Sequence, residues 1–487
     1  MRLSYISSAL SLILKDIGIV AFIPIFVALF YHEHHAILPF TTAGFLSLFL
    51  GMLLKKVTKN ISSDSLNDIK RSEALMVVTL SWMSFGFIAA IPYLFYGFSF
   101  TDSLFEAVSG ITTTGATIFE SYAYPHSLLF WRSFTQWLGG MGIIVLFVAI
   151  LPQFAVAGRQ MFFAEAPGPT EDKFTPRIRN TASALWIIYA GLTLVCGICL
   201  WLAGMHPFDS ICNSMSTLSA GGFSPNSLST YGYHSNLINW IIIIFMFIAG
   251  SSFVLQSRVV TKRKLSLFWK SEEFKVYAIS MLVLSGLLCL ALCLKQHYSF
   301  FHSITASFYQ VLSLATSTGS ASEDFSLWSY DAKVFLFLTM FISSCSGSAG
   351  GGLKITRWIL IFKYMKNELY KILHPKAVLS VKIDNKVVAP DVLRQTVFFA
   401  FCFFGMWVLS AVILTVMEQD SLIGLSSAIS SIGDIGPALE PAIGPLGSYA
   451  HLRDISKLIL ILNMLVGRLE IIPFLVLFHK DFWSIKK

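Results

Sequence analysis

Charged residues are scarce in this 487-residue sequence, where Asp, Glu, Lys and Arg together make up 13% and hydrophobic residues 55%. A soluble protein of this length could not bury so many apolar side chains, which excludes a soluble globular protein. Several apolar runs approach the roughly 20 residues that a helix needs to cross a bilayer, most clearly 238–255. Regular alternation of polar and apolar residues is lacking, which excludes a transmembrane β-barrel.

Motifs that bind nucleotides or carry out catalysis are also lacking. One glycine-rich run resembles a phosphate-binding loop, but Leu353 separates Gly352 from Lys354 and no strand precedes the run. Almost all seven cysteines lie in apolar segments, and Cys196 and Cys199 have no second pair with which to bind zinc. We therefore predict that this chain is not an enzyme and that it binds no cofactor.

The net charge of +8 is distributed in a way that does not suit nucleic-acid binding. Basic residues gather in alternate loops, over 55–71, 159–179, 258–275 and 354–394, whereas 31–36, 98–127 and 205–236 contain none. The positive-inside rule makes the basic loops cytoplasmic. By the same rule Arg2 and Lys15 place the N-terminus in the cytoplasm, and Lys480, Lys486 and Lys487 place the C-terminus there.

One pattern recurs four times along the chain. A long apolar helix is followed by a segment too short to span a membrane, then by a cluster of small and hydroxyl residues, then by another apolar helix. The short segments are 100–110, 207–217, 301–313 and 421–430, and the clusters contain Gly115, Gly222, Gly319 and Gly436. These glycines recur roughly every 100 residues, which indicates a tandem repeat.

A short helix followed by returning extended backbone is typical of a re-entrant loop. Exposed backbone at membrane depth is tolerated only where it lines a water-filled cavity or is buried in protein. Four such loops around one axis would offer rings of carbonyls to a dehydrated cation, at the negative ends of four short helices. The alternative is four ordinary Gly/Ser/Thr turns.

Five stretches carry a more specific resemblance, which covers nearly the whole chain. They are 131–142 (Trp-Arg-Ser-Phe-Thr-Gln-Trp-Leu-Gly-Gly-Met-Gly), 164–169, 175–177, 374–378 and 467–470 (Gly-Arg-Leu-Glu). They resemble the TrkH branch of the TrkH/KtrB superfamily of potassium transporters. The resemblance implies an all-α membrane protein with four tandem helix–pore loop–helix repeats around a pseudo-fourfold pore, and an extra N-terminal helix pair.

The implied domain boundaries follow the repeats. Residues 1–72 would hold the N-terminal helix pair, 73–158 repeat 1, 159–258 repeat 2, 259–366 repeat 3 and 367–487 repeat 4. Five helix pairs give ten spanning segments, with four re-entrant loops in addition.

The resemblance also implies a selectivity filter, with potassium bound at its residues as the transported ion. The implied filter residues are Thr113, Thr114, Gly115, Ala220, Gly221, Gly222, Ser317, Thr318, Gly319, Asp434, Ile435 and Gly436. Two positions depart from the family pattern, because Asp434 stands where Asn is usual and Ser320 where Phe is common. The Asp434 carboxylate could raise the local cation concentration, or it could be neutralised by a hydrogen bond and be structural.

The second helix of repeat 3 is interrupted by small residues over 343–352, which cannot hold a stable helix. This break is similar to the family's intramembrane gating loop. The implied gate residues are Gly347, Gly350, Gly351, Gly352, Lys354 and Arg468. A charge deep in an apolar helix is costly, so Arg468 is expected either to face the pore or to pair with Glu470 or backbone carbonyls.

The predicted function is potassium uptake across a bacterial inner membrane, by a multi-pass protein with both termini in the cytoplasm. The resemblance implies homodimerisation and a cytosolic, nucleotide-binding TrkA-type partner. It leaves open whether transport is channel-like or a symport coupled to protons or sodium. A sodium-permeable relative is one alternative, against which Gly115 argues. A metabolite transporter is another, but its repeats would alternate in orientation, whereas these are parallel.

A metal site is one reading of His32, His34 and His35 around Glu33 at the outer end of the first spanning helix. The other reading, which we favour, is that they are solvated loop residues.

Overall fold

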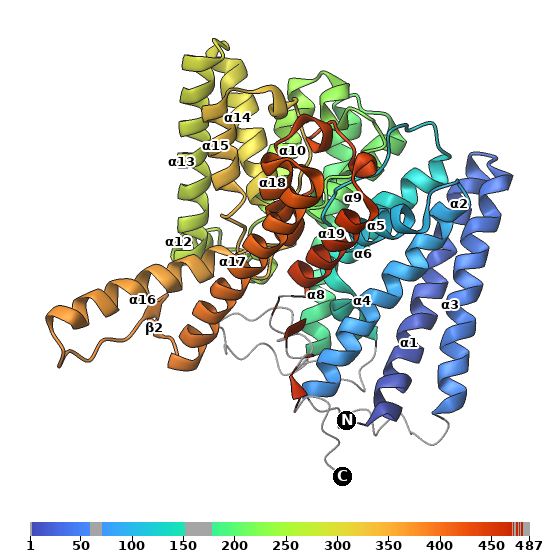
Figure 1. Cartoon of the computed structure of the whole chain (residues 1–487), viewed down its shortest axis with the longest axis horizontal. Coiled ribbons are helices and arrows are strands. Elements are labelled where there is room, and N and C mark those ends of the chain that lie inside the picture. The colour runs from blue at the N-terminus through green and yellow to red at the C-terminus, as the bar shows by residue number, and fades with distance from the viewer. Residues whose placement is uncertain are drawn as a thin grey trace.

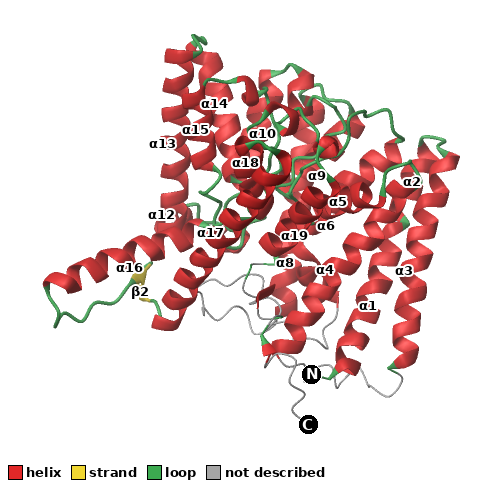
Figure 2. Cartoon of the chain, viewed as in Figure 1, coloured by secondary structure: helices red, strands yellow, loops and turns green. Residues whose placement is uncertain are grey.

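The computed structural model describes residues 2–58, 71–150 and 178–469, and residues 471, 474, 475, 477, 479 and 480 near the C-terminus. The stretches 164–169 and 175–177, Glu470, and the terminal lysines Lys486 and Lys487 lie outside the described residues. Within these ranges the chain is helical apart from loops and one short hairpin, β1 (Lys382–Ile383) paired antiparallel with β2 (Lys386–Val387) (Figure 2).

An N-terminal helix pair forms one edge of the bundle, opposite α13 (Glu272–Lys295) (Figure 1). It consists of α1 (Leu3–Ala21), α2 (Ile23–Phe30) and, after the 3-10 turn η1 (His34–Ala36), α3 (Ile37–Val57). The helices approach closely because serine hydroxyls bond backbone carbonyls across them, as Ser47 Oγ does to Leu14 O at 2.6 Å. The outer faces carry exposed aromatics such as Phe26 and Phe30, which suits contact with lipid.

Four helical units follow, each with a long first helix, a short helix and a second helix, which is divided into two helices in units 2 and 3. Unit 1 contains α4 (Arg71–Leu94), α5 (Phe100–Ile111) and α6 (His126–Ile150). Unit 2 contains α8 (Ile178–Leu202), α9 (Pro207–Leu218), α10 (Asn236–Ala249) and α11 (Phe253–Lys262). Unit 3 contains α13, α14 (Phe300–Ala315), α15 (Tyr330–Thr339) and α16 (Ile355–Leu373), after the short α12 (Ser266–Lys270). Unit 4 contains α17 (Pro390–Glu418), α18 (Ser421–Ile432) and α19 (Asp454–Arg468).

Among the described residues six helices are long and apolar enough to cross a membrane, or seven if α10 and α11 count as one span bent by 93°. They are 3–30, 34–56, 75–94, 183–202, 272–295 and 390–418. The count differs from the ten predicted because the second helices of the units are irregular. Helix α6 has non-helical angles at Gly142, α15 and α16 are separated by a loop, and α19 has 15 residues.

The short helices α5, α9, α14 and α18 lie within one or two residues of the predicted segments. Local sequence explains where they begin. The Ser99 hydroxyl caps α5 by accepting from Asp102 N at 3.1 Å, and the Asp420 carboxylate caps α18 through Leu422 N at 2.7 Å. Helix α9 begins at Pro207, where a missing N–H costs nothing.

Unit 4 also packs against unit 1, because α19 contacts both α18 and α5. The Lys457 ammonium at the start of α19 lies 2.6 Å from the Asp102 carboxylate at the start of α5 and 2.8 Å from Ala450 O. Only 4% of the Lys457 side chain is exposed. This partly buried ion pair joins the last unit to the first, so the four units close on themselves.

Candidate functional site

The four glycine clusters share one backbone conformation. The residue two before each glycine has a positive φ: Thr113 59°, Ala220 57°, Ser317 58° and Asp434 53°. Each glycine also has a positive φ: Gly115 84°, Gly222 74°, Gly319 71° and Gly436 106°. The residue between them does not, so left-handed and ordinary conformations alternate in every unit.

The amide groups of these clusters turn toward the short helices. A serine carbonyl in each short helix accepts from the residue before the glycine. These bonds are Thr114 N to Ser109 O at 2.9 Å, Gly221 N to Ser216 O at 2.9 Å, Thr318 N to Ser313 O at 2.8 Å and Ile435 N to Ser430 O at 2.8 Å. Because the N–H groups face outward to the helices, the carbonyls are left to face the other way.

The clusters also form a closed ring, which we call the carbonyl ring (backbone of 113–115, 220–222, 317–319 and 434–436). A Cβ added to any ring glycine would clash with a carbonyl oxygen of the next unit. The pairs are Gly115 with Gly221 O, Gly222 with Thr318 O, Gly319 with Ile435 O, and Gly436 with Thr114 O. Only glycine lets the four strands approach this closely.

On one side the ring opens into a cavity of about 670 Å³ lined by all four ring glycines. The loops that follow the ring form its wall, including Thr117, Ser224 and Glu120. The cavity is a vestibule large enough to hold hydrated ions next to the ring.

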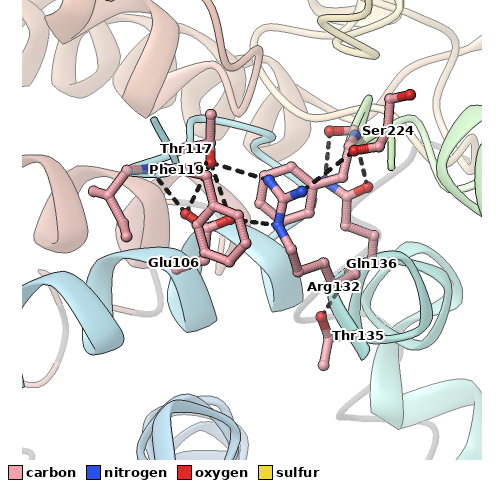
Figure 3. Close-up of polar contacts among 10 residues, drawn as sticks. Glu106, Thr117, Phe119, Arg132, Thr135, Gln136 and Ser224 are labelled. Carbon is pink, nitrogen blue, oxygen red and sulfur yellow. Dashed lines mark hydrogen bonds and ion pairs between the residues drawn. The ribbon is translucent and has the colours of Figure 1, made fainter. Parts of the chain in front are cut away.

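A buried ion pair supports the ring in unit 1 (Figure 3). Arg132 Nε on α6 lies 2.7 Å from Glu106 Oε1 on α5, and both side chains are at most 1% exposed. The same guanidinium donates to Thr117 Oγ1 at 3.0 Å and to Ser224 O of unit 2 at 3.3 Å. This pair therefore holds together the segments that follow the ring in units 1 and 2.

Gln136, one turn further along α6, contacts the ring itself. Its amide donates to the ring carbonyl of Gly221 at 2.6 Å and accepts from Phe223 N at 3.0 Å (Figure 3). A Cβ at Gly221 would lie 2.5 Å from the Gln136 carboxamide carbon. Gln136 therefore explains why unit 2 has glycine where unit 1 has Thr114.

No role for Glu106, Arg132 or Gln136 was predicted from the sequence. For Glu106 and Arg132 the detectable signal was charge in largely apolar segments, where an ionisable residue marks a partner or a functional site, whereas Gln136 is uncharged and gave no such signal. Their partners lie 26 to 92 residues away in the chain, and no local pattern identifies them.

The predicted break in unit 3 is a loop of residues 340–354, between α15 and α16, which we call the intramembrane loop. It lies directly against the carbonyl ring. Gly351 N donates to Ser317 Oγ at 2.8 Å, and a Cβ on Gly351 would lie 2.8 Å from Asp434 Oδ2. A Cβ on Gly350 would lie 2.6 Å from Thr316 O. The loop therefore packs against the ring segments of units 3 and 4, and Gly350 and Gly351 are required for that approach.

The intramembrane loop is also bonded to the bend between α10 and α11. Cys345 N donates to Gly250 O at 2.9 Å, and Phe253 N donates to Gly347 O at 3.0 Å. Gly347 and Gly352 have φ of 72° and 71°, which favours glycine at both positions. Lys354 Nζ donates to Ser348 O at 3.3 Å within the loop.

Arg468, the last residue of α19, binds backbone carbonyls. Its Nη1 donates to Ala349 O of the intramembrane loop at 3.0 Å, and its Nη2 to Gly139 O and Gly140 O of α6 at 2.5 and 3.3 Å. The pairing with carbonyls is thus observed, while Glu470 lies outside the described residues. Arg468 connects the loop, unit 1 and unit 4.

The two departures from the family pattern have defined partners. Asp434 Oδ1 accepts from Thr114 Oγ1 at 3.0 Å, which joins units 4 and 1. Ser320 Oγ lies 3.0 Å from the Tyr309 hydroxyl.

Glu33 has a capping role in the structure. Its carboxylate accepts from His126 N at 2.6 Å and Ser127 N at 3.1 Å at the start of α6. His32, His34 and His35 are exposed. Among the described residues no group of three or more His, Cys, Asp or Glu side chains could hold a metal ion.

Four re-entrant backbone strands that close a ring inside a bundle of apolar helices define a membrane transport protein. Residues 40–485 match the TrkH family, described as cation transport proteins. The chain therefore belongs to the TrkH family, and the predicted all-α membrane fold is confirmed. A family of cation transporters also confirms that the chain is not an enzyme, and it argues against a metabolite transporter.

Individual relatives agree. The chain is 37% identical over 467 residues to the Trk system potassium uptake protein TrkH of Salmonella typhimurium, covering 95% of each. It is 33% identical over 469 residues to TrkG of Escherichia coli, covering 94% of each. The crystal structure of the potassium transporter TrkH from Vibrio parahaemolyticus superposes with a TM-score of 0.88 at 32% identity, over 99% of this chain and 100% of that one.

Proposed function

We propose that this protein takes up potassium ions across a bacterial inner membrane through the carbonyl ring. The observation that carries the proposal is the closed contact of four strands, in which every ring glycine touches a carbonyl of the next unit. The relatives named above as potassium uptake proteins support the choice of ion.

In this proposal a potassium ion exchanges its hydration shell for ring carbonyls. The ligands come from Thr113, Thr114, Gly115, Ala220, Gly221, Gly222, Ser317, Thr318, Gly319, Asp434, Ile435 and Gly436. The short helices end at the ring, so their negative ends favour a cation there. Gly115, rather than a residue with a side chain, keeps unit 1 equivalent to the others and favours potassium over the sodium-permeable alternative.

The intramembrane loop acts as the gate in this proposal. Its glycines, Gly347, Gly350, Gly351 and Gly352, let the backbone fit beneath the ring, while Lys354 and Arg468 hold it by hydrogen bonds to carbonyls. Flux would require this loop to move away from Ser317 and Asp434.

A cytosolic, nucleotide-binding TrkA-type subunit would control that movement, and the protein would work as a homodimer. The support for partners is the name "Trk system" among the relatives and the basic loops. Helix α16 and the β1–β2 hairpin project from the bundle, with Phe362, Leu369 and Leu373 exposed (Figure 1). Both termini would lie in the cytoplasm with this projection. The proposal applies equally to a channel and to a symport that couples potassium uptake to protons or sodium.

The direct test is flux of K⁺, Rb⁺ and Na⁺ into liposomes that contain the purified protein. We expect K⁺ and Rb⁺ to enter faster than Na⁺. Equal entry of all three ions would favour the sodium-permeable alternative, and no cation entry by folded protein would overturn the proposal.

Gln136→Leu is expected to lower the preference for K⁺ over Na⁺ roughly tenfold. The change keeps the side-chain size but removes both hydrogen bonds to unit 2, at a cost of about 1–3 kcal/mol for unpaired buried groups. The measurement is the ratio of ion fluxes in liposomes. Gln256→Leu is the matched control, because Gln256, on α11 of unit 2, is buried like Gln136 but bonds Ile248 O and Ser251 rather than the ring. An unchanged ratio in Gln136→Leu would show that Gln136 does not position the ring.

A further inference from the structure

Side chains form a separate layer beneath the carbonyl ring. They belong to the residue two before each ring glycine, namely Thr113, Ala220, Ser317 and Asp434. Because all four share the same left-handed backbone, with φ between 53° and 59°, their Cβ atoms leave the ring on the same side. That side faces the intramembrane loop, since Ser317 Oγ accepts from Gly351 N and Asp434 Oδ2 lies 2.8 Å from the position of a Gly351 Cβ.

Two oxygen atoms in this layer have no hydrogen-bond partner among the described residues. They are Thr113 Oγ1 and Asp434 Oδ2, and both residues are completely buried. The other carboxylate oxygen of Asp434 is occupied by Thr114 Oγ1. A buried carboxylate oxygen without a partner is costly, so such an atom calls for a bound ligand.

The nearby arginine does not supply that partner. Arg468 Nη1 and Nη2 are engaged by Ala349 O, Gly139 O and Gly140 O. A Cβ on Gly467 would lie 3.2 Å from Asp434 Oδ2, so α19 leaves the carboxylate room by having glycine there. Asp434 Oδ2 therefore lies close to two glycines, Gly351 and Gly467.

We propose that Asp434 Oδ2, Thr113 Oγ1 and Ser317 Oγ form a side-chain site for one monovalent cation between the carbonyl ring and the intramembrane loop. Hydroxyl and carboxylate oxygens are ligands that alkali cations accept in place of water. The Ser317 hydroxyl can accept from Gly351 N and still offer a second lone pair to the ion. One carboxylate among neutral oxygens suits a single positive charge better than a divalent ion, which favours several carboxylates or retained waters.

This site rests on the proposed function but adds to it. The ring carbonyls would select the ion, whereas the side-chain site would hold it at the exit, where Gly351 blocks the way. Unit 2 contributes no side-chain oxygen, because its residue at the equivalent position is Ala220. The site is therefore one-sided, with its negative charge in unit 4.

The test measures how potassium stabilises the purified full-length protein. Thermal unfolding in detergent is followed while KCl replaces choline chloride at constant ionic strength. We expect Asp434→Asn to raise the half-stabilising K⁺ concentration about tenfold, the fold-change for roughly 1.4 kcal/mol of lost binding. Asn retains an acceptor for Thr114 and tolerates the left-handed backbone, so this variant is expected to fold.

Further variants make the result specific. Asp420→Asn is the matched control, because it removes one negative charge from the same unit at the cap of α18, away from the ring. Thr113→Val should raise the half-stabilising concentration several-fold, and Thr113→Ser should not. This pair decides the question if Asp434→Asn proves unstable.

The outcomes separate the two proposals. If wild-type protein neither conducts K⁺ nor is stabilised by it, the proposed function itself fails. If wild-type protein does both, but Asp434→Asn shows the same K⁺ dependence, only the side-chain site is overturned. A loss of stability that is equal in choline and in potassium also overturns the side-chain site. Asp434 would then only balance the positive charge of Arg468.

Discussion

Gly222→Ser is expected to lower potassium flux by roughly tenfold to a hundredfold and to remove most of the preference for K⁺ over Na⁺. A Cβ at this position clashes with Thr318 O of the next unit, and the positive φ of 74° disfavours any side chain. The ring must open at the junction of units 2 and 3, so its carbonyls can no longer surround a dehydrated ion. The measurement is K⁺ and Na⁺ flux into liposomes, normalised to folded protein.

Gly191→Ser provides the matched control for this result. Gly191 lies on α8 of the same unit, and a Cβ there meets no atom within 4 Å. We expect its fluxes to equal those of the wild type. Wild-type ion preference in well-folded Gly222→Ser would show that the ring is not the selective part of the pathway.

Arg468→Ala is expected to raise basal potassium flux about tenfold in the absence of any cytosolic partner. The substitution removes the charged hydrogen bond to Ala349 O, worth about 1.5–3 kcal/mol, so the blocking position of the intramembrane loop becomes less populated. It also removes a positive charge that repels a nearby cation. Thermal stability should fall at the same time, because Gly139 O and Gly140 O lose their donor.

The control is Arg453→Ala, which removes the same charge from the exposed outer end of the same helix. Its flux and stability should remain near those of the wild type. Reduced stability in Arg468→Ala without a rise in flux per folded protein would mean that the arginine only holds the bundle together. A decrease in flux at full stability would mean that it orders the conducting state.

The sequence was sufficient to locate the parts of the site that depend on local features. The short helix α18 begins at Ser421, as predicted, because Asp420 directly before it is a strong capping residue. The ring glycines were identified from their recurrence, and all four have the positive φ that makes glycine necessary. The break before Lys354 was visible because several small residues interrupt an apolar run.

Contacts between segments far apart in the chain could not be predicted from the sequence. Nothing local to Gln136 indicates that its amide reaches Gly221, and nothing local to Arg468 indicates that it reaches Gly139, which lies 329 positions earlier. The break in the second helix of repeat 3 was predicted, but the bend of 93° between α10 and α11 was not, because it depends on packing against another unit.

That bend gives the intramembrane loop a mechanical attachment outside its own unit. Backbone hydrogen bonds from Cys345 N to Gly250 O and from Phe253 N to Gly347 O hold the loop on both sides of the bend. If α11 rotates about the bend, these backbone bonds require the loop to move with it. Movement of α11 therefore reaches the ion pathway through main-chain hydrogen bonds, and Gln256 of α11 braces the same bend through its bonds to Ile248 O and Ser251.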